Sequence, residues 1–168
     1  MKTSYEVRAR LFLNQIYPFI KDCVDVGDYC EAVDKFNATF HRAVRIANGL
    51  TRVALITSDY VIKIDCGARH NISRFGGCEN EYHKYQKIVR DGYGYLFAKI
   101  SPVMRGDKVV YIMPRIHNVG SEHSNYEDVY YWLNEEENDY VYDICQDLHY
   151  NNYGWENGYP VIIDYACG

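Results

Sequence analysis

Hydrophobic residues recur at intervals of three and four along the first fifty positions of the chain. Residues 4–24 carry one such run, which predicts an amphipathic helix with Ser4 as its N-cap and Pro18 as a residue that ends or kinks it. A second run spans residues 29–47 and predicts another helix that stops at Asn48-Gly49. We therefore expect the N-terminal residues to form a helical extension.

The hydrophobic pattern changes after residue 50 to short runs that are rich in β-branched and aromatic side chains. Residues 51–57 and 60–65 are two such runs separated by a tight polar turn, which predicts a hairpin. Residues 93–100 and 108–113 predict two further strands, flanking a turn at Met104–Asp107. These four segments are expected to form a small antiparallel sheet.

The remaining segments alternate between helical patterns and polar loops. Helices are predicted at 79–90, 126–134 and 137–147, loops at 66–77 and 148–158, and a short buried strand at 160–164. Helices and strands that follow one another in this order are typical of the α+β class. The length of 168 residues favours one domain.

Composition and charge restrict the classes of partner. The chain has 18 Lys and Arg against 23 Asp and Glu, a formal net charge of -5, so it has no basic field that would attract nucleic acid or anionic lipid. Its 18 tyrosines favour protein contacts, although only weakly. No long apolar run occurs, and we expect neither a signal peptide nor a membrane span.

The six cysteines are scattered, with no Cys-x-x-Cys pair and no histidine at the spacing of a zinc finger. A disulfide framework is more typical of smaller secreted chains. We therefore expect a reduced, cytoplasmic protein.

The most informative pattern for function lies in the last quarter of the chain. Asp147 is followed five residues later by Asn152, and Asp164 closes an apolar strand twelve residues after that asparagine. This arrangement resembles the catalytic loop and the metal-binding aspartate of the protein-kinase-like superfamily. The Asp-Leu-His sequence at Asp147 is most similar to the aminoglycoside and small-molecule phosphotransferases of that superfamily.

The resemblance implies roles for these three residues in phosphoryl transfer from ATP. Asp147 would orient or deprotonate the acceptor hydroxyl, whereas Asn152 and Asp164 would hold Mg²⁺ against the phosphates. Taken singly, Asp147 and Asn152 could equally cap a helix and shape a turn, and Asp164 could simply end a strand. The order and spacing of the whole set favour the functional interpretation.

The strand at 60–65 carries a second part of the resemblance. Tyr60-Val61-Ile62-Lys63 is similar to the Val-Ala-Ile-Lys strand whose lysine binds the α- and β-phosphates. Glu81, on the following helix, would be the ion-pair partner of Lys63, with Glu79 as the competing candidate. Met113 and Arg115 fall where the family's hinge would bind adenine through main-chain groups. A single strand lysine or helix glutamate is more often only a surface charge.

The chain also departs from the family pattern. No glycine-rich loop precedes Lys63, Cys145-Gln146 replaces the His-Arg of a His-Arg-Asp motif, and the sequence stops four residues after Asp164. We therefore expect a minimal form of the fold without an activation segment. It would have a helical extension over 1–50, a sheet and helix over 51–117, and a much reduced C-terminal lobe over 118–168 in a single domain.

Two functions from different classes fit this pattern. One is a minimal phosphotransferase that uses ATP and Mg²⁺ and acts on a hydroxyl of a protein or small molecule, with its acceptor surface supplied by a protein partner or a homo-oligomer. The alternative is a catalytically inactive kinase-like binding module or inhibitor of a host protein. A small, acidic, pared-down chain also resembles proteins of viruses and mobile elements, which would place it in the host cytoplasm.

Overall fold

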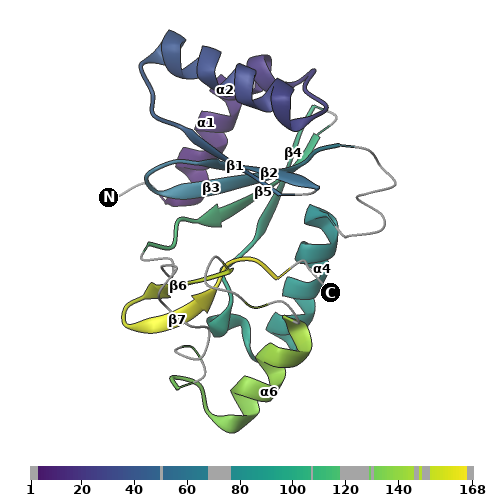
Figure 1. Cartoon of the computed structure of the whole chain (residues 1–168), viewed down its shortest axis with the longest axis vertical. Coiled ribbons are helices and arrows are strands. Elements are labelled where there is room, and N and C mark those ends of the chain that lie inside the picture. The colour runs from purple at the N-terminus through teal and green to yellow at the C-terminus, as the bar shows by residue number, and fades with distance from the viewer. Residues whose placement is uncertain are drawn as a thin grey trace. The chain divides into compact units, whose positions relative to one another are not determined.

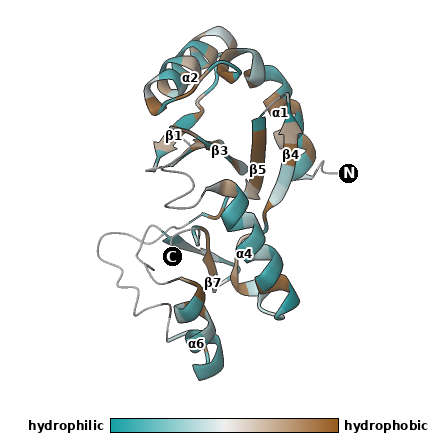
Figure 2. Cartoon of the chain, turned by 90° about the vertical axis from the view of Figure 1, so that its right-hand side faces the viewer, coloured by the Kyte–Doolittle hydropathy of each residue, from teal (hydrophilic) through white to brown (hydrophobic). Residues whose placement is uncertain are grey.

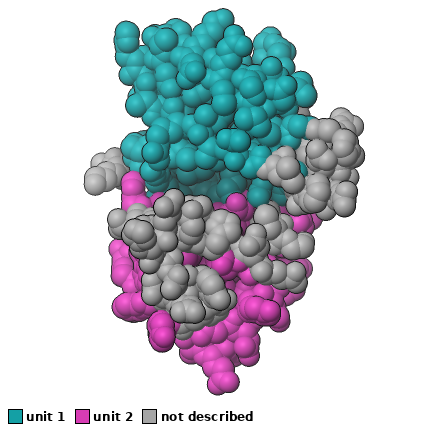
Figure 3. All heavy atoms as spheres, viewed as in Figure 1, with its two compact units in different colours: residues 1–78, 100–115 teal, residues 79–99, 116–168 magenta. Residues whose placement is uncertain are grey.

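The computed structural model describes residues 4–49, 51–67, 77–106, 108–117, 129, 131–145, 148 and 152–165. They belong to two compact units, residues 1–78 with 100–115 and residues 79–99 with 116–168, which Figure 3 shows in two colours. The described residues contain four α-helices, a five-stranded antiparallel sheet and a two-stranded sheet. The predicted α+β class is therefore confirmed.

The first unit is built on the five-stranded sheet (Figure 1). Its strands are β1 (Arg45–Asn48), β2 (Arg52–Ile56), β3 (Tyr60–Asp65), β4 (Ser101–Arg105) and β5 (Lys108–Pro114), in the spatial order β1-β2-β3-β5-β4. The predicted hairpin is confirmed as β2 and β3, in which Ala54 pairs with Lys63. Strand β3 lies in the middle of the sheet because β5 pairs with its other edge.

Helices α1 (Tyr5–Ile20) and α2 (Val26–Phe40) pack on one face of this sheet. Helix α1 begins as predicted at Ser4, whose side chain accepts a hydrogen bond from the Val7 amide. It ends two residues after Pro18, which lies in its last turn. Asp25 and Asp28 form a reciprocal capping box at the start of α2.

The second helix is shorter than its sequence pattern predicts. Helix α2 ends at Phe40 and is followed by His41, which adopts a left-handed conformation (φ 50°), whereas the prediction extended the helix to residue 47. Residues 45–48 instead form β1, in which Ile46 pairs with Leu55 of β2. The prediction was wrong because the strand conformation depends on this pairing rather than on local periodicity.

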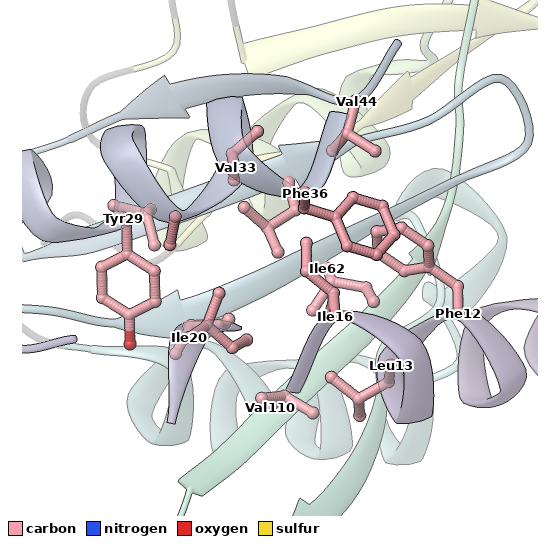
Figure 4. Packing of buried hydrophobic residues seen from close by; sticks show 14 of the residues in the cluster. Phe12, Leu13, Ile16, Ile20, Tyr29, Val33, Phe36, Val44, Ile62 and Val110 are labelled. Atoms are coloured by element: carbon pink, nitrogen blue, oxygen red, sulfur yellow. The ribbon is translucent and has the colours of Figure 1, made fainter. Parts of the chain in front are cut away.

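Aromatic rings join α1 to α2 within the buried cluster of this unit (Figure 4). The ring of Phe36 lies 5.5 Å from Phe12, 5.5 Å from Phe19 and 4.9 Å from Phe40, measured between ring centroids. The contacts of Phe36 with Phe12 and Phe19 are edge-to-face, which is a favourable geometry for aromatic pairs. Phe36 is therefore the centre of the core in this unit.

The second unit contains most of α4 (Cys78–Arg90), the 3₁₀ turn η1 (Gly94–Leu96), α6 (Glu135–Ile144) and the hairpin of β6 (Tyr153–Glu156) and β7 (Tyr159–Ile162). The hydropathy colouring in Figure 2 shows β7 as strongly hydrophobic, as it does β5 of the first unit. Helix α4 confirms the predicted helix at 79–90. None of the helices within the described part of the chain is both long and apolar enough to cross a bilayer.

Two predictions for loops and strands were wrong. Residues 93–100 form η1 and extended chain, and the strand that pairs with β5 is β4 at residues 101–105. The predicted loop at 148–158 contains β6, which pairs with β7 from Tyr153 opposite Ile162 to Glu156 opposite Tyr159. Most of the loop predicted at 66–77 lies outside the described residues, as do residues 126–128 and 130 of the helix predicted at 126–134. Residues 131–134 of that predicted helix are described and are not helical.

Candidate functional site

Lys63 lies on the central strand of the first unit, on the face of the sheet that points away from α1 and α2. Ile62 and Ile64 belong to the core beneath the helices, so the alternation of side chains along β3 puts Lys63 on the opposite face. Its cross-strand neighbours are Ala54 and Tyr111. The side chain is only 9% exposed, which is unusual for a lysine and argues against an ordinary surface charge.

Met113 shares this face with Lys63, because Ile112 before it points into the helix-covered core. Met113 is buried and pairs with Val61, and the β4 ladder already ends at Ile112. Arg115 is placed differently. Its amide donates to the Asp59 carbonyl (2.9 Å) and its guanidinium donates to the Thr57 carbonyl (2.7 Å).

These bonds give Arg115 a structural task at the β2–β3 turn. They also commit its main-chain N–H to a partner within the chain, so that this donor is not available to adenine in the described conformation. The adenine-binding role predicted for Arg115 therefore depends on its remaining main-chain carbonyl, and Met113 is the better placed of the two residues.

Glu81 and Glu79 are the two glutamates of α4 that the sequence analysis named as candidate partners of Lys63, and Glu81 is the buried one. It has no exposed surface (0%), whereas Glu79 is exposed at the start of the helix. Fully buried carboxylates are rare in proteins and require compensating interactions. Lys63 belongs to the first unit and Glu81 to the second, so the ion pair between them stays a prediction.

The β6–β7 hairpin of the second unit is held by contacts from two other segments of that unit. The Ala98 amide donates to the Ile162 carbonyl (2.8 Å), and the Trp155 amide donates to the His117 carbonyl (3.4 Å). Gly154 allows the segment at Ile116 and His117 to lie close to β6, since a Cβ atom at Gly154 would lie 2.6 Å from Cγ2 of Ile116. The ends of the hairpin are thereby fixed within the unit.

Asn152 and Asp164, the two predicted metal ligands, lie next to each other at one end of this hairpin. The main-chain carbonyl of Asn152 accepts hydrogen bonds from the amides of Ile163 (2.7 Å) and Asp164 (3.3 Å). Asn152 is buried and Asp164 is half-buried. The fold thus brings together the main chains of two residues that are twelve positions apart in the sequence.

Tyr165, directly after Asp164, is an organising residue that the sequence analysis did not single out. Its hydroxyl donates to the Ala98 carbonyl (3.0 Å), and its ring packs edge-to-face on Phe97 with the centroids 5.2 Å apart. Burial raises the pKa of the Tyr165 phenol far above its usual value, and the neighbouring Glu81 raises it further. The only signal in the sequence was an aromatic residue following an acid at the end of an apolar strand.

The donor set at the hairpin end fits Mg²⁺. Magnesium prefers oxygen ligands and is commonly bound through one or two carboxylates together with substrate phosphates and water, and Asp164 and Asn152 supply one carboxylate and one amide oxygen. No cluster of three or more His, Cys, Asp or Glu side chains suited to a metal occurs among the residues whose placement is described. Asn152 and Asp164 alone would leave several of the ligand positions of Mg²⁺ to be filled by other groups. Asp147, the predicted catalytic residue, lies outside the described residues.

Comparison with known proteins gives no family assignment. Neither a protein-family model nor a curated protein sequence matches the chain.

Proposed function

We propose that the chain is an ATP- and Mg²⁺-dependent phosphotransferase acting on a hydroxyl group of a protein or a small molecule. The observation that carries this proposal is the main-chain link between Asn152 and Asp164 at one end of the β6–β7 hairpin, because both side chains carry oxygen atoms of the type that Mg²⁺ prefers. The order of the predicted residues along the chain adds support, because Lys63 lies on a strand and Glu81 on the helix that follows it, as expected.

Each residue has a separate task in the proposed reaction. Asn152 and Asp164 would hold Mg²⁺, which would neutralise charge on the phosphates, and Lys63 would bind the phosphates directly. Glu81 orients Lys63, and Met113 contacts adenine. Asp147 accepts a hydrogen bond from the acceptor hydroxyl and takes its proton as the hydroxyl oxygen bonds to the γ-phosphorus, while the bond from the γ-phosphorus to the β–γ bridging oxygen breaks and ADP leaves.

The burial of Lys63 in the first unit and of Glu81 in the second supports the roles proposed for these two residues. Removing an ionised side chain from water costs free energy, so a lysine that is 9% exposed and a glutamate that is 0% exposed need a compensating role. Phosphate binding and its support provide such a role. A purely surface function for either residue is inconsistent with this burial.

The alternative function is a catalytically inactive kinase-like module that binds or inhibits a host protein, including one encoded by a virus or mobile element. The observation that favours it is a set of large aromatic side chains exposed in the second unit: Tyr131, Trp132, Tyr142 and Tyr159. Aromatic residues are enriched at protein interfaces, where they provide much of the binding free energy.

Isothermal titration calorimetry with ATP in the presence and absence of Mg²⁺ tests the metal site. We expect ATP to bind more tightly with Mg²⁺, and Asp164→Asn to remove the dependence on the metal while the protein stays folded. Asp139→Asn is the matched control, because Asp139 is exposed on α6. Absence of ATP binding at about 1 mM, a concentration that detects even weak sites, would contradict the proposal.

The variant Asp147→Ala separates the two functions. A phosphotransferase should still bind ATP but lose phosphorylation of its acceptor, measured as transfer of the labelled γ-phosphate to a copurified protein or to the chain itself. A binding module should keep its biological effect in Asp147→Ala and lose it when Tyr142 and Tyr159 are replaced by serine.

A further inference from the structure

A pocket of about 470 Å³ lies in the first unit, on the face of the sheet that α1 and α2 cover. Three segments line it: the first half of α1, residues 42–44 after α2, and the β2–β3 turn at 57–60. Its volume is in the range of small-molecule sites. Tyr60 points to this side of β3, whereas Lys63 points to the other, so the pocket is separate from the proposed phosphate-binding face.

The walls of the pocket are held by side-chain hydrogen bonds to the main chain. Asn37 clamps the 42–44 segment, since its amide nitrogen donates to the Val44 carbonyl (2.8 Å) and its amide oxygen accepts from the Val44 amide (3.0 Å). Thr57 closes the turn on the other side, donating to the Tyr60 carbonyl (2.9 Å) and accepting from the Tyr60 amide (3.2 Å). A site that is already ordered loses less entropy when a ligand binds.

The charges in the lining favour an anion. Arg8 and Arg42 are its two cations and Asp59 is its single acid. The Arg8 Nε atom forms an ion pair with the Asp59 carboxylate (2.9 Å), whereas Arg42 makes no ion pair with any residue that the structure describes. Arg42 is exposed, so its guanidinium group is accessible to a ligand carrying one negative charge.

Both guanidinium groups act on a single buried phenol. Burial raises the pKa of Tyr60, and the positive charges of Arg42 and Arg8 oppose that increase. Both arginines line the pocket together with Tyr60. At neutral pH the Tyr60 hydroxyl is protonated, and it remains a hydrogen-bond donor for an anionic oxygen.

The other side of the lining is apolar. Leu11, Phe12, Ala43 and Val44 contribute to it, and Leu11 is 58% exposed although it is on a helix that packs on the core. Phe12 and Val44 also belong to the buried cluster drawn in Figure 4, so the apolar wall continues into the core. A ligand that covers Leu11 would gain from burying its surface.

We propose that this pocket binds an amphipathic monocarboxylate, with its carboxylate on Arg42 and its aliphatic or aromatic part on Leu11 and Phe12. Such a carboxylate occurs either in a free small acid or at the C-terminus of a peptide with an apolar last residue. A guanidinium group recognises both through two parallel hydrogen bonds to the carboxylate oxygens.

Titration of the full chain, followed by amide chemical shifts in NMR, tests the proposal. The probes are 4-phenylbutyrate as the free acid and acetyl-Leu-Phe with a free C-terminus as the peptide, each compared with its uncharged amide. We expect at least one acid to bind, with shifts at residues 42–44 and 57–60, and its amide to bind at least about tenfold more weakly, as expected for losing a charged hydrogen bond. Tighter binding of 4-phenylbutyrate would identify the ligand as a free small acid, and tighter binding of acetyl-Leu-Phe would identify it as the C-terminus of a peptide.

Two variants of the pocket test the assignment of charge in opposite directions. Arg42→Gln should weaken binding about tenfold or more, whereas Arg45→Gln, an exposed arginine of β1 outside the lining, should not. Asp59→Asn should strengthen binding, because it removes the competing carboxylate from Arg8. The gain of affinity cannot result from misfolding.

Three results would overturn the proposal: no binding of either acid at about 10 mM, equal binding of an acid and its amide, or weaker binding in Asp59→Asn. The proposal is independent of the phosphotransferase function. Asp164→Asn should leave carboxylate binding unchanged, and failure of ATP binding would have no effect on the shifts at residues 57–60.

Discussion

The hydroxyl of Tyr165 donates a hydrogen bond of 3.0 Å to the main-chain carbonyl of Ala98. Ala98 itself donates through its amide to Ile162, three residues before Tyr165. The chain on both sides of Asp164 is therefore tied to the same short segment, by Ile162 before it and by Tyr165 after it. The position of the proposed metal ligand is set by these two bonds rather than by contacts of its own carboxylate alone.

Replacing Tyr165 by phenylalanine should destabilise the protein by about 1–3 kcal/mol, because the buried Ala98 carbonyl loses its donor while the aromatic packing is kept. Urea-induced unfolding, followed by circular dichroism, measures the change. Tyr159→Phe is the matched control, since Tyr159 is 68% exposed and should contribute almost nothing. Equal effects of the two variants would show that the bond to Ala98 does not stabilise the fold.

Alkaline pH should destabilise the folded state through its tyrosines. Burial raises the pKa of Tyr165 and Tyr140, and a hydrogen bond to Glu137 raises that of Tyr95 to about 12, all from an ordinary value of 10. Below pH 10 these phenols are neutral in both states and their contribution to stability is fully present. Above pH 10 the unfolded chain ionises first, so the free energy of unfolding should fall as the pH rises.

Urea titrations at pH 8 and pH 11 measure this change. Tyr165→Phe should show a smaller decrease between the two pH values than the unchanged protein, since it lacks one of the shifted groups. Cys66 contributes in the same direction, because burial raises the pKa of its thiol from 9, and it should be replaced by serine in both proteins compared. A steeper decrease in Tyr165→Phe would contradict the assignment.

Phe36→Ala should be among the most destabilising substitutions in the first unit, with a loss of about 3–5 kcal/mol, because it removes a fully buried ring in contact with Phe12 and Phe19. Phe40→Ala removes the same kind of side chain from the same helix, but Phe40 is 45% exposed and its loss should cost clearly less. Thermal or urea unfolding ranks the two variants. The opposite ranking would place the centre of the core elsewhere.

Gly106→Ala should destabilise the first unit more than Gly67→Ala. Both glycines have positive φ values, 62° and 86°, so each substitution carries a backbone cost of about 1–2 kcal/mol. Only at Gly106 does the added Cβ also collide with a side chain, the Tyr17 hydroxyl, at 1.7 Å. The additional cost at Gly106 measures this steric conflict.

A double-mutant cycle with Tyr17→Ala isolates that conflict. If the collision is responsible, Gly106→Ala should cost less in the Tyr17→Ala background, where it should match Gly67→Ala. Strictly additive effects of the two substitutions would show that Tyr17 has no part in the cost.

Local sequence patterns predicted those elements whose residues favour one conformation regardless of their partners. The β-branched residues of β2 and β3, the Ser4 cap of α1 and the periodicity of α4 are such cases, and the structure confirms all three. The sequence also supplied the order and spacing of Lys63, Glu81, Asn152 and Asp164, on which the resemblance to the kinase-like pattern depends. The preference for Glu81 over Glu79 also came from periodicity, and Glu81 is the one that is buried.

Strands β1 and β6 were missed because neither has a strong pattern of its own. Arg45–Asn48 continues a helical spacing, and Tyr153–Glu156 lies within a segment rich in asparagine and glycine. Each becomes a strand through hydrogen bonds to a neighbour, β2 in one case and β7 in the other. Such pairing depends on which segments the fold brings together, and propensity alone does not encode it.

The sequence by itself determined the α+β class, the central hairpin and the identity of the candidate phosphotransferase residues, because these depend on local periodicity and on side-chain chemistry. Only the tertiary structure decided that Asn152 and Asp164 adjoin, that Tyr165 is anchored to Ala98, that Arg115 holds the β2–β3 turn, and that two arginines face one pocket. The physical reason is that hydrogen bonds and burial join residues far apart in the chain. Their pairing follows from the packing of the whole unit, not from any short segment.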